Sequence, residues 1–236
     1  MQGGLSMAQK KQSKINKMRQ LIAKESPRSP ISEQYRTIRT NLQYASVDKE
    51  IRSLLLTSAG PSEGKSLTTA NLAVVYAQQG KKVLLIDGDL RKPTVHYTFR
   101  INNLQGLSNI LIGDISLEEA VVTSEVENLD IISCGPIPPN PSELLGSRKM
   151  QELIEEAKQS YDMVIIDTPP VLAVTDSQIL SNFVDGAILV VRSKATEIEA
   201  AQKSIEALQA VNANILGTIL NDRDKKEANH YYYYGN

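Results

Sequence analysis

The stretch SAGPSEGKS at residues 58–66 has the residue types and the spacing that bind a phosphate chain. It joins two apolar runs, which predicts a loop between a buried strand and a buried helix. In such a loop the backbone N–H groups face an anion, Lys65 reaches the terminal phosphates, and the Ser66 hydroxyl binds Mg²⁺. Ala59 stands where the usual pattern has its first glycine, and alanine is tolerated there if its φ is negative. We therefore predict a nucleotide-binding loop made of Gly60, Pro61, Ser62, Glu63, Gly64, Lys65, Ser66 and Leu67.

Three aspartates stand at the ends of two other apolar runs. VLLIDGDLR contains Asp87 and Asp89, and MVIID ends with Asp167. Because ligands of open α/β sheets bind beyond the carboxyl ends of the strands, we expect these carboxylates beside the phosphate loop. A single aspartate after a strand often caps a turn, but three converging on one loop favour an Mg²⁺–phosphate site. The expected metal-binding residues are Ser66, Asp87, Asp89 and Asp167.

The elements that would position these residues alternate along the chain. Apolar runs predict strands at 53–58, 82–87, 129–134, 162–168, 186–193 and 214–221. Most are continuously apolar, as expected of a parallel sheet with helices on both faces. Helices between them are indicated by two capping boxes, SLEE at 116–119 and TEIE at 196–199. Two apolar stripes also indicate helices: Met150, Leu153, Ile154 and Ala157, and then Ile198, Ala201, Ile205 and Leu208. The predicted fold class is α/β, with a doubly wound, mainly parallel sheet flanked by helices.

Length, charge and cysteine content limit the classes of protein to which this chain can belong. The 236 residues suit one large domain, and the net charge of −1 gives no reason to expect a nucleic-acid partner. A single cysteine, Cys134, excludes an internal disulfide and suits a reducing cytoplasm. No apolar run approaches the roughly 20 residues that span a bilayer, so we expect a cytoplasmic protein. Neither Cys134 nor His96 has partners at metal or nucleophile spacing, so both are expected to be structural.

The two ends of the chain differ from its centre. We expect a flexible basic arm at 1–25, a folded domain at 26–222 and a flexible tyrosine-rich tail at 223–236. Residues 1–6 are set aside from the fold prediction, and Met7 is a candidate natural start. The arm is a solvated segment, or it is attracted to an anionic membrane face or a membrane-bound partner. Its basic residues are Lys10, Lys11, Lys14, Lys17, Arg19 and Lys24. The tail holds four of the nine tyrosines, in HYYYYGN, and the polar residues before them offer no core in which to bury them.

Together these motifs resemble the deviant-Walker P-loop ATPases, which include the cell-division and plasmid-partition ATPases. Within that group the chain is most similar to the bacterial tyrosine kinases (BY-kinases) of capsule and exopolysaccharide operons. The similarity covers roughly residues 26–236 and includes SPISEQYRTIRTNLQYAS, LLIDGDLRKPTVH, GPIPPNPSELL, DTPPVLAVTD and the tyrosine-rich tail. Partition and division ATPases carry an additional lysine in the phosphate loop, and Gly60 occupies that position here.

The resemblance implies an ATP- and Mg²⁺-dependent protein-tyrosine kinase. Its catalytic residues would be Lys65, Asp87, Asp89 and Asp167, with Asp87 as base and near-metal group and the other aspartates supporting Mg²⁺, partly through water. Asn221, at the end of the last predicted strand, is a candidate for binding adenine, or it is only a polar residue at a strand end.

The resemblance also implies an assembly. Glu33, Arg36 and Arg39 are spaced to share one side of a helix, opposite Tyr35, Ile38 and Leu42, as a solvated face or as the family's oligomerisation element. Subunits would pair head to tail into a ring, an octamer in the family, so that one subunit's tail enters a neighbour's site. Tyr231, Tyr232, Tyr233 and Tyr234 would then be autophosphorylated in trans.

The partners implied by the family are a membrane-embedded modulator of the polysaccharide co-polymerase type, a cognate phosphotyrosine phosphatase and protein tyrosine substrates. The modulator would recruit the chain to the inner face of the membrane. GPIPPNPSELL, at 135–145, is a rigid connector or captures a regulatory segment. Two other functions stay open: a positional ATPase that switches membrane or DNA attachment, and a nucleotide-binding scaffold without transfer activity.

Overall fold

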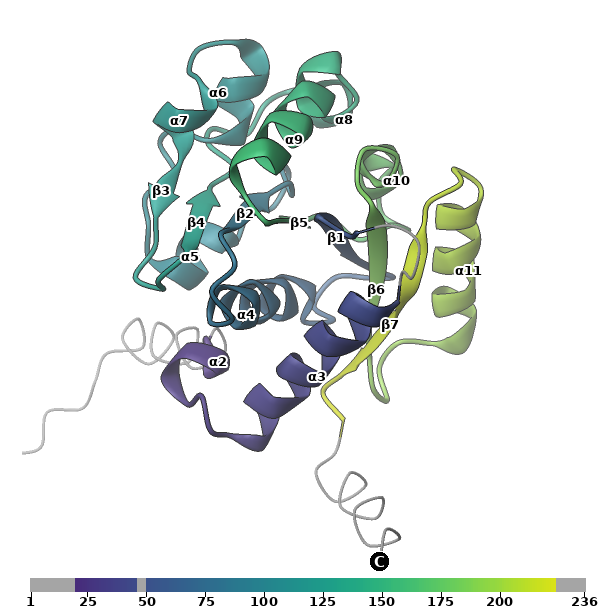
Figure 1. The fold of residues 1–236 in the computed structure, drawn as a ribbon. Coiled ribbons are helices and arrows are strands. Elements are labelled where there is room, and N and C mark those ends of the chain that lie inside the picture. The colour runs from purple at the N-terminus through teal and green to yellow at the C-terminus, as the bar shows by residue number, and fades with distance from the viewer. Residues whose placement is uncertain (1–19, 46–49, 224–236) are drawn as a thin grey trace, which may run out of the picture.

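A mainly parallel β-sheet forms the centre of the molecule, and helices cover both of its faces (Figure 1). The computed structural model describes residues 20–45 and 50–223, and within these residues the sheet has seven strands in the order β3-β4-β2-β5-β1-β6-β7. The predicted doubly wound α/β fold is confirmed. The strands are β1 (Ser53–Ser58), β2 (Val83–Asp87), β3 (Val122–Thr123), β4 (Leu129–Ile132), β5 (Met163–Asp167), β6 (Gly186–Arg192) and β7 (Ile215–Asn221).

Neighbouring strands of this sheet run parallel, except that β3 and β4 are antiparallel. The six strands expected from the sequence are all present, with ends within two residues of the predicted ones. The edge strand β3 was not predicted. It contains only Val122 and Thr123, and two residues are too few to show a periodic pattern.

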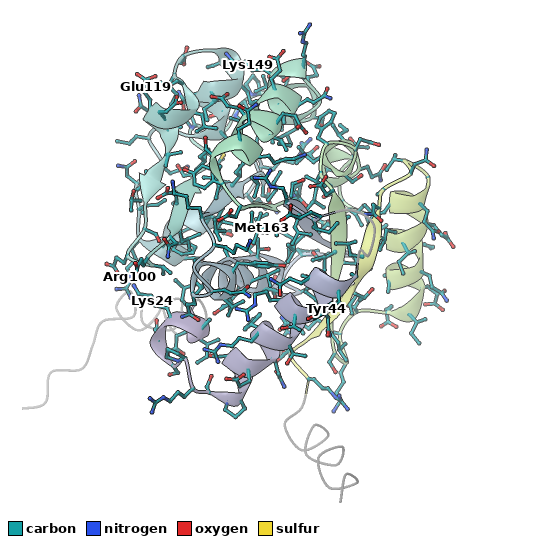
Figure 2. The ribbon with its side chains drawn as sticks, viewed as in Figure 1. Lys24, Tyr44, Arg100, Glu119, Lys149 and Met163 are labelled. Atoms are coloured by element: carbon teal, nitrogen blue, oxygen red, sulfur yellow. The ribbon has the colours of Figure 1, made fainter. Side chains whose placement is uncertain are left out.

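Alternate residues of the central strands face opposite sides of the sheet and build an apolar core on each side. Leu54 and Leu56 of β1 pack into one core, whereas Leu55 packs into the other. Figure 2 shows side chains filling the space between the sheet and its helices. The first core lies under α2 (Ile22–Glu25), α3 (Pro30–Tyr44), α4 (Lys65–Ala77) and α5 (Val95–Phe99). The second lies under α6 (Leu107–Ile112), α7 (Leu117–Ala120), α8 (Pro141–Leu145), α9 (Arg148–Ser160) and α10 (Asp176–Ser181).

Local sequence explains where several helices begin. Ser29 caps α3 and Pro30 occupies its first turn, where the missing N–H costs nothing. Ser147 caps α9, whose predicted stripe of Met150, Leu153, Ile154 and Ala157 is buried. The capping box predicted at 116–119 is confirmed at the start of α7.

The capping box predicted at 196–199 is wrong. Helix α11 (Ile198–Gln209) begins after Glu197, and no side chain caps it. The Thr196 hydroxyl donates instead to Glu63 Oε1, 2.8 Å away, because the fold brings the phosphate loop against this turn. The apolar stripe is also weaker than expected, since Ile198 is 75% exposed and Leu208 is its fully buried member. Helix α11 packs at the edge of the sheet, against β6 and β7, so its burial is one-sided.

The folded part of the chain begins earlier than residue 26, so the boundary predicted there is wrong. Leu21 and Ala23 are buried in the first core. The Ala23 N–H donates to Asn71 Oδ1 of α4 at 2.9 Å, and Gln78 Nε2 donates to Ala23 O at 2.9 Å. These bonds from a neighbouring helix hold α2 in place, and the sequence around α2 contains no local sign of them. Residues 1–19 and 224–236 lie outside the described part of the chain.

Ile154→Ala is expected to lower the free energy of unfolding by about 2–5 kcal/mol, because it removes buried atoms and leaves a cavity between α9 and the sheet. Urea denaturation followed by circular dichroism measures this loss. Ile198→Ala is the matched control, since most of its side chain is exposed, and it should change the same free energy by less than about 0.5 kcal/mol. An equal loss of unfolding free energy in the two variants would show that Ile198 is packed as tightly as Ile154.

Candidate nucleotide and magnesium site

The loop between β1 and α4 has the backbone form that phosphate binding requires. Gly64 is the N-cap of α4, and no side chain caps the first turn, which leaves N–H groups at this helix end for an anion. Its φ of 87° favours glycine, and an added Cβ would come within 2.0 Å of Asn221 Nδ2. Ala59 has no positive φ, so alanine is accommodated where the usual pattern has glycine.

This phosphate loop is held through Glu63, whose side chain is buried. Glu63 Oε2 accepts from the Ala59 N–H at 3.0 Å, and Oε1 accepts from the Thr196 hydroxyl at 2.8 Å. The Asn221 amide donates to Glu63 O at 2.9 Å from the end of β7. The structure therefore places Asn221 against the loop, and its role in adenine binding stays a prediction.

Lys65 and Asp167 form a buried ion pair, with Lys65 Nζ 2.7 Å from Asp167 Oδ1. Lys65 is the first residue of α4, and Asp167 is the last residue of β5, which pairs directly with β1. Thr69 Oγ1 also approaches Asp167 Oδ1, at 3.3 Å. The lysine head group therefore lies between the phosphate loop and the carboxyl edge of the sheet, where a triphosphate would need it.

Asp87 lies opposite Asp167 in the register of β2 and β5. Burial, followed by the negative charge of Asp167, raises the pKa of Asp87 to about 7, and the Val95 amide and Lys65 oppose that rise. Its Oδ2 accepts from the Thr94 and Val95 N–H groups at 3.0 Å each. This carboxyl group can therefore gain or lose a proton near neutral pH.

Asp89 lies two residues further on and is held by the loop that follows β2. Its Oδ1 accepts from the Lys92 N–H at 2.9 Å and from the Arg91 N–H at 3.3 Å. The Asp89 N–H in turn donates to Asp87 Oδ1 at 3.3 Å. Asp87 and Asp89 are thus linked within one short loop at the carboxyl edge of the sheet.

The donor set suits magnesium bound together with phosphates. Within residues 20–45 and 50–223, no group of three or more acidic, histidine or cysteine side chains is arranged as a metal cage. The structure places Asp87 beside Asp167 and Asp89 at one edge of the sheet, and their roles in holding Mg²⁺, partly through water, stay a prediction. Asp167 Oδ2, however, is buried without a hydrogen-bond partner. Because Mg²⁺ is usually bound by one or two carboxylates plus waters and phosphate oxygens, this oxygen and the Ser66 hydroxyl fit it.

A contact between Arg91 and Asp176 was not predicted. The Arg91 guanidinium donates to both carboxylate oxygens of Asp176, at 2.9 and 3.1 Å. The two residues lie 85 positions apart, so no local pattern could have paired them. The sequence contains one signal for these two residues: each lies in a motif used for the resemblance. Arg91 belongs to LLIDGDLRKPTVH, and Asp176 belongs to DTPPVLAVTD.

The residues predicted to mediate assembly lie on α3 but do not share one face. Glu33 and Arg36 form an ion pair at the surface. Arg39 turns toward α4, where its Nη1 donates to Val75 O at 2.7 Å, and burial lowers the pKa of its guanidinium. The expected common side opposite Tyr35, Ile38 and Leu42 is therefore wrong for Arg39.

Two residues expected to be structural can be placed. Cys134 is buried after β4, and burial, with smaller contributions from Asp87 and Asp89, raises the pKa of its thiol to about 12. The thiol is thus protonated near neutral pH and a poor nucleophile. His96 lies on α5 with its ring 3.9 Å from that of Tyr97.

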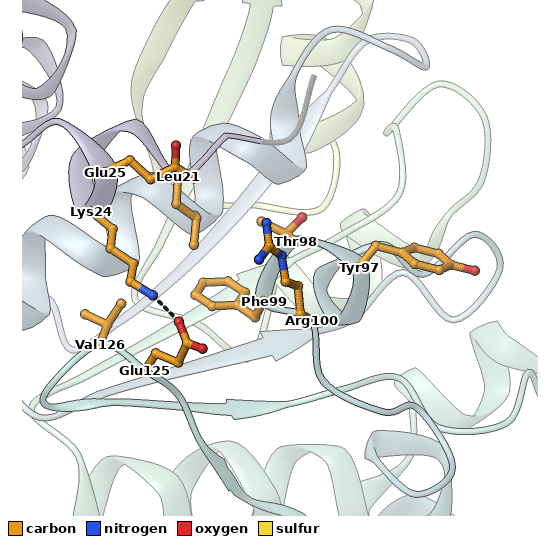
Figure 3. A pocket seen from close by; sticks show the side chains of 9 residues that line it. All are labelled: Leu21, Lys24, Glu25, Tyr97, Thr98, Phe99, Arg100, Glu125 and Val126. Carbon is orange, nitrogen blue, oxygen red and sulfur yellow. Dashed lines mark hydrogen bonds and ion pairs between the residues drawn. The ribbon is translucent and has the colours of Figure 1, made fainter. Parts of the chain in front are cut away.

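A cavity of about 270 Å³ lies elsewhere, between α2, the end of α5 and the turn that connects β3 and β4 (Figure 3). Lys24 and Glu125, two of its lining residues, form an ion pair, and Tyr97 points away from that pair. Because Glu125 is 83% exposed, the pair contributes little stability. The cavity contains none of the predicted site residues, so it is distinct from the phosphate loop.

The chain is similar in sequence to proteins that are named tyrosine-protein kinases. A family model described as an AAA domain matches residues 60–220. The chain is 54% identical over 229 residues to tyrosine-protein kinase YwqD of Bacillus subtilis (strain 168), covering 97% of each chain. It is 41% identical to the putative tyrosine-protein kinase CapB of Staphylococcus aureus, covering 91% of this chain and 95% of that one. A putative tyrosine-protein kinase in the cps region of Klebsiella pneumoniae is also 41% identical, but the match covers 29% of that longer protein.

The chain is also similar in structure to a tyrosine kinase domain and to related solved proteins. The kinase domain of Escherichia coli tyrosine kinase ETK superposes with a TM-score of 0.85 at 37% identity, covering 88% of this chain and 81% of that one. The chimerical protein CapA2B2 gives 0.84 at 45% identity, covering 87% and 90%. The septum site-determining protein MinD of Pyrococcus horikoshii, complexed with Mg-ADP, gives 0.63 at 29% identity, covering 74% and 72%.

Asp87→Asn is expected to stabilise the nucleotide-free protein at about pH 5 and to stabilise it considerably more at about pH 8. The folded chain keeps a proton on Asp87 up to about pH 7, whereas the unfolded chain loses it near its ordinary pKa of 3.8. Stability therefore falls as pH rises through this window, and the cost of the buried charge is fully present above it. Thermal unfolding of both proteins at the two pH values measures the difference.

Asp114→Asn, at an exposed carboxylate, is the control for the removal of one negative charge. If the Asp87→Asn protein gains the same melting temperature at both pH values, burial of the Asp87 charge is not the cause.

Proposed function

The chain belongs to the family of bacterial tyrosine-protein kinases, and from this premise we propose that it phosphorylates the tyrosine cluster at its own carboxyl terminus in trans, within a ring of identical subunits. The observation that carries this proposal is the buried Lys65–Asp167 pair beside the phosphate loop, with Asp87 next to it. A kinase for tyrosine needs a phosphate site, a proton acceptor and a phenol within reach, and we assign these to the loop with Lys65, to Asp87 and to the terminal tyrosines.

The residues have separate tasks in the proposed transfer. The loop amides and Lys65 bind the phosphates of ATP, and Ser66, Asp89 and Asp167 hold the Mg²⁺ shell, partly through water. Magnesium, when bound, neutralises charge on the phosphates. Asp87 accepts the phenolic proton as the tyrosine oxygen forms its bond to the γ-phosphorus and the bond to the β-phosphate oxygen breaks. Because its pKa lies near neutral pH, the Asp87 carboxyl group is suited to take up and release that proton.

The position of β7 supports the role of the tail. Asn221 ends β7 and bonds to the phosphate loop, and the following Asp222 pairs with Arg192 at 2.7 Å. Tyr231 follows Asn221 by about ten residues, which can span roughly 30 Å. A segment of this length is compatible with transfer within one chain and with transfer to an adjacent subunit, and mixing two chains distinguishes these routes.

Mixing two chains, neither of which can phosphorylate its own tail, tests transfer in trans. Lys65→Met lacks the phosphate-binding lysine but keeps the tail, whereas a chain with Tyr231 to Tyr234 changed to Phe keeps the site and lacks the phenols. After incubation with Mg-ATP and the cytosolic segment of the proposed modulator, phosphate is expected on the tail of the Lys65→Met chain. Intact-mass analysis and phosphotyrosine mapping measure this.

The test needs one control, and one outcome would refute the proposal. Lys65→Met leaves the Asp167 carboxylate buried without its partner, which can cost about 3–5 kcal/mol, so thermal unfolding must first show that this chain is folded. Phosphate that appears only where Lys65 and the four tyrosines belong to one chain would refute transfer in trans.

The ring is proposed to use Glu33 and Arg36, because this ion pair lies at the surface of α3 whereas Arg39 is engaged with α4. Arg36→Glu should replace the attraction within the pair by repulsion and shift the assembly, an octamer in the proposal, toward monomers. Light scattering after size-exclusion chromatography measures the mass. Arg148→Glu is the control for charge reversal, since Arg148 also pairs with a glutamate of its own helix, Glu152 on α9. Dissociation by both variants, or by neither, would contradict the role of α3.

The proposed setting is capsule or exopolysaccharide biosynthesis at the inner face of the membrane. Similarity to a kinase in a cps region and to the CapA2B2 chimera supports this setting. Among the described residues, no helix is both long and apolar enough to cross a bilayer. By resemblance to the family, we propose that the chain works in the cytoplasm, that a membrane-embedded modulator recruits it, and that a phosphotyrosine phosphatase reverses its action.

The alternative, a positional ATPase, has weaker support. The MinD structure shares 29% identity with this chain, and the kinases reported above share 37–54%. Gly60 also replaces the additional lysine expected of that group. ATP turnover without stable phosphotyrosine in the mixing experiment would favour the alternative.

A further inference from the structure

Asp176 is a buried carboxylate that the proposed transfer does not use. It is the first residue of α10 and has no exposed surface. Arg91 Nε donates to its Oδ2 at 2.9 Å, and Arg91 Nη2 and the Ser142 hydroxyl donate to its Oδ1 at 3.1 and 2.7 Å. Because a buried carboxylate without donors is costly, such a complete set of bonds indicates that its place in the fold is tightly determined.

The same arginine belongs to the segment that orients Asp89. The Arg91 and Lys92 N–H groups donate to Asp89 Oδ1, so the backbone at Arg91 holds Asp89 from one side. The Arg91 side chain leaves that backbone toward α10 and ends in the two-pronged bond to Asp176. Fixing the guanidinium therefore restricts the amides that hold the Asp89 carboxylate.

Ser177, the next residue of α10, connects this first helical turn to β1 and to the residue that follows β5. Its buried hydroxyl lies 3.1 Å from Thr57 Oγ1 and 3.0 Å from Thr168 Oγ1. Thr57 stands near the end of β1, before the phosphate loop, and Thr168 follows Asp167. The first turn of α10 is thus a common anchor for the phosphate loop, the Asp167 strand and, through Asp176, the Asp89 loop.

We propose that Asp176 is a positioning residue for magnesium-dependent phosphoryl transfer, acting through Arg91 to orient Asp89. The inference rests on the magnesium role proposed above for Asp89. It also assigns a task to the proline-rich segment 135–145. Ser142, in the first turn of α8, donates to Asp176 and accepts from Arg91 Nη2 at 2.8 Å, so this segment completes the clamp.

Kinetics as a function of magnesium test the proposal. The full chain, with the modulator segment, is assayed for the maximal rate of phosphotyrosine formation and for the Mg²⁺ concentration at half-saturation. Asp176→Asn is expected to change one or both by roughly 10- to 100-fold, as is typical when a residue that orients a metal ligand is changed. ADP affinity without magnesium should stay unchanged, because the phosphate loop keeps its contacts.

Two further variants test the route through Arg91. Arg91→Lys keeps the charge but loses the two-pronged bond, so its effect should lie between the parent and Arg91→Ala. Arg91→Ala combined with Asp176→Asn should be no worse than the more severe single variant, because both remove one interaction. Arg91→Lys keeps a cation beside the buried Asp176 carboxylate and is therefore the variant expected to fold. Arg91→Ala leaves that carboxylate without its charged partner, so thermal unfolding is measured for every variant before the kinetics.

Asp185→Asn is the matched control. Asp185 is also a buried carboxylate with several donors, the Arg52 and Ser53 N–H groups and the Ser53 hydroxyl, but it lies at the opposite edge of the sheet. Asp185→Asn should lower the melting temperature. It should leave the Mg²⁺ concentration at half-saturation and the maximal rate of phosphotyrosine formation as in the parent chain. An equal magnesium shift in Asp185→Asn, or none in the Arg91 and Asp176 variants, would overturn the inference.

Asp89→Asn separates this failure from failure of the proposed function. If it changes the magnesium dependence while the Arg91 and Asp176 variants do not, only the positioning role of Asp176 is wrong. If Asp89→Asn leaves that dependence unchanged, the magnesium role of Asp89 is wrong, and the positioning role that rests on it is wrong as well.

Discussion

The Lys65 ammonium and the Asp167 carboxylate form an ion pair 2.7 Å long between the first residue of α4 and the last residue of β5, almost wholly shielded from water. Shielding makes the attraction strong, but it also makes either charge costly if it stands alone. The pair therefore requires that α4 and β5 keep their relative positions. It concentrates at one edge of the sheet a positive charge suited to phosphate and a carboxylate oxygen suited to a hard cation.

The buried Lys65–Asp167 pair also affects the carboxylates around it. Asp87 lies opposite Asp167 in the sheet, so part of the rise in its pKa comes from a charge that Lys65 only partly compensates. The backbone amides at Thr94 and Val95 supply further donors. One buried cation and a few backbone amides thus allow several acidic groups to gather where the strands end. The low-dielectric interior keeps their mutual interactions strong.

Rigid placement of the loops comes from residues far away in the sequence. Thr196 and Asn221 hold the phosphate loop through Glu63, and the first turn of α10 holds the loops that carry Asp89 and Asp167. Each contact is polar and at least partly buried, so each fixes direction as well as distance. The central strands supply the stable platform, and these side chains set the positions of the loops upon it.

Six of the seven strands in the described part of the chain, the phosphate loop and the position of the three aspartates at strand ends could be predicted from the sequence, because they depend on local patterns. Continuous apolar runs indicate buried strands, and GKS between two such runs indicates a phosphate loop. Tertiary structure alone decided that Leu21 and Ala23 belong to the core, that Thr196 bonds to Glu63 rather than capping α11, and that Arg39 turns onto α4. It also decided which carboxylate pairs with Lys65 and which guanidinium holds Asp176. Those partners lie between 36 and 133 positions apart, and such contacts arise only from the packing of the whole chain, which no local pattern encodes.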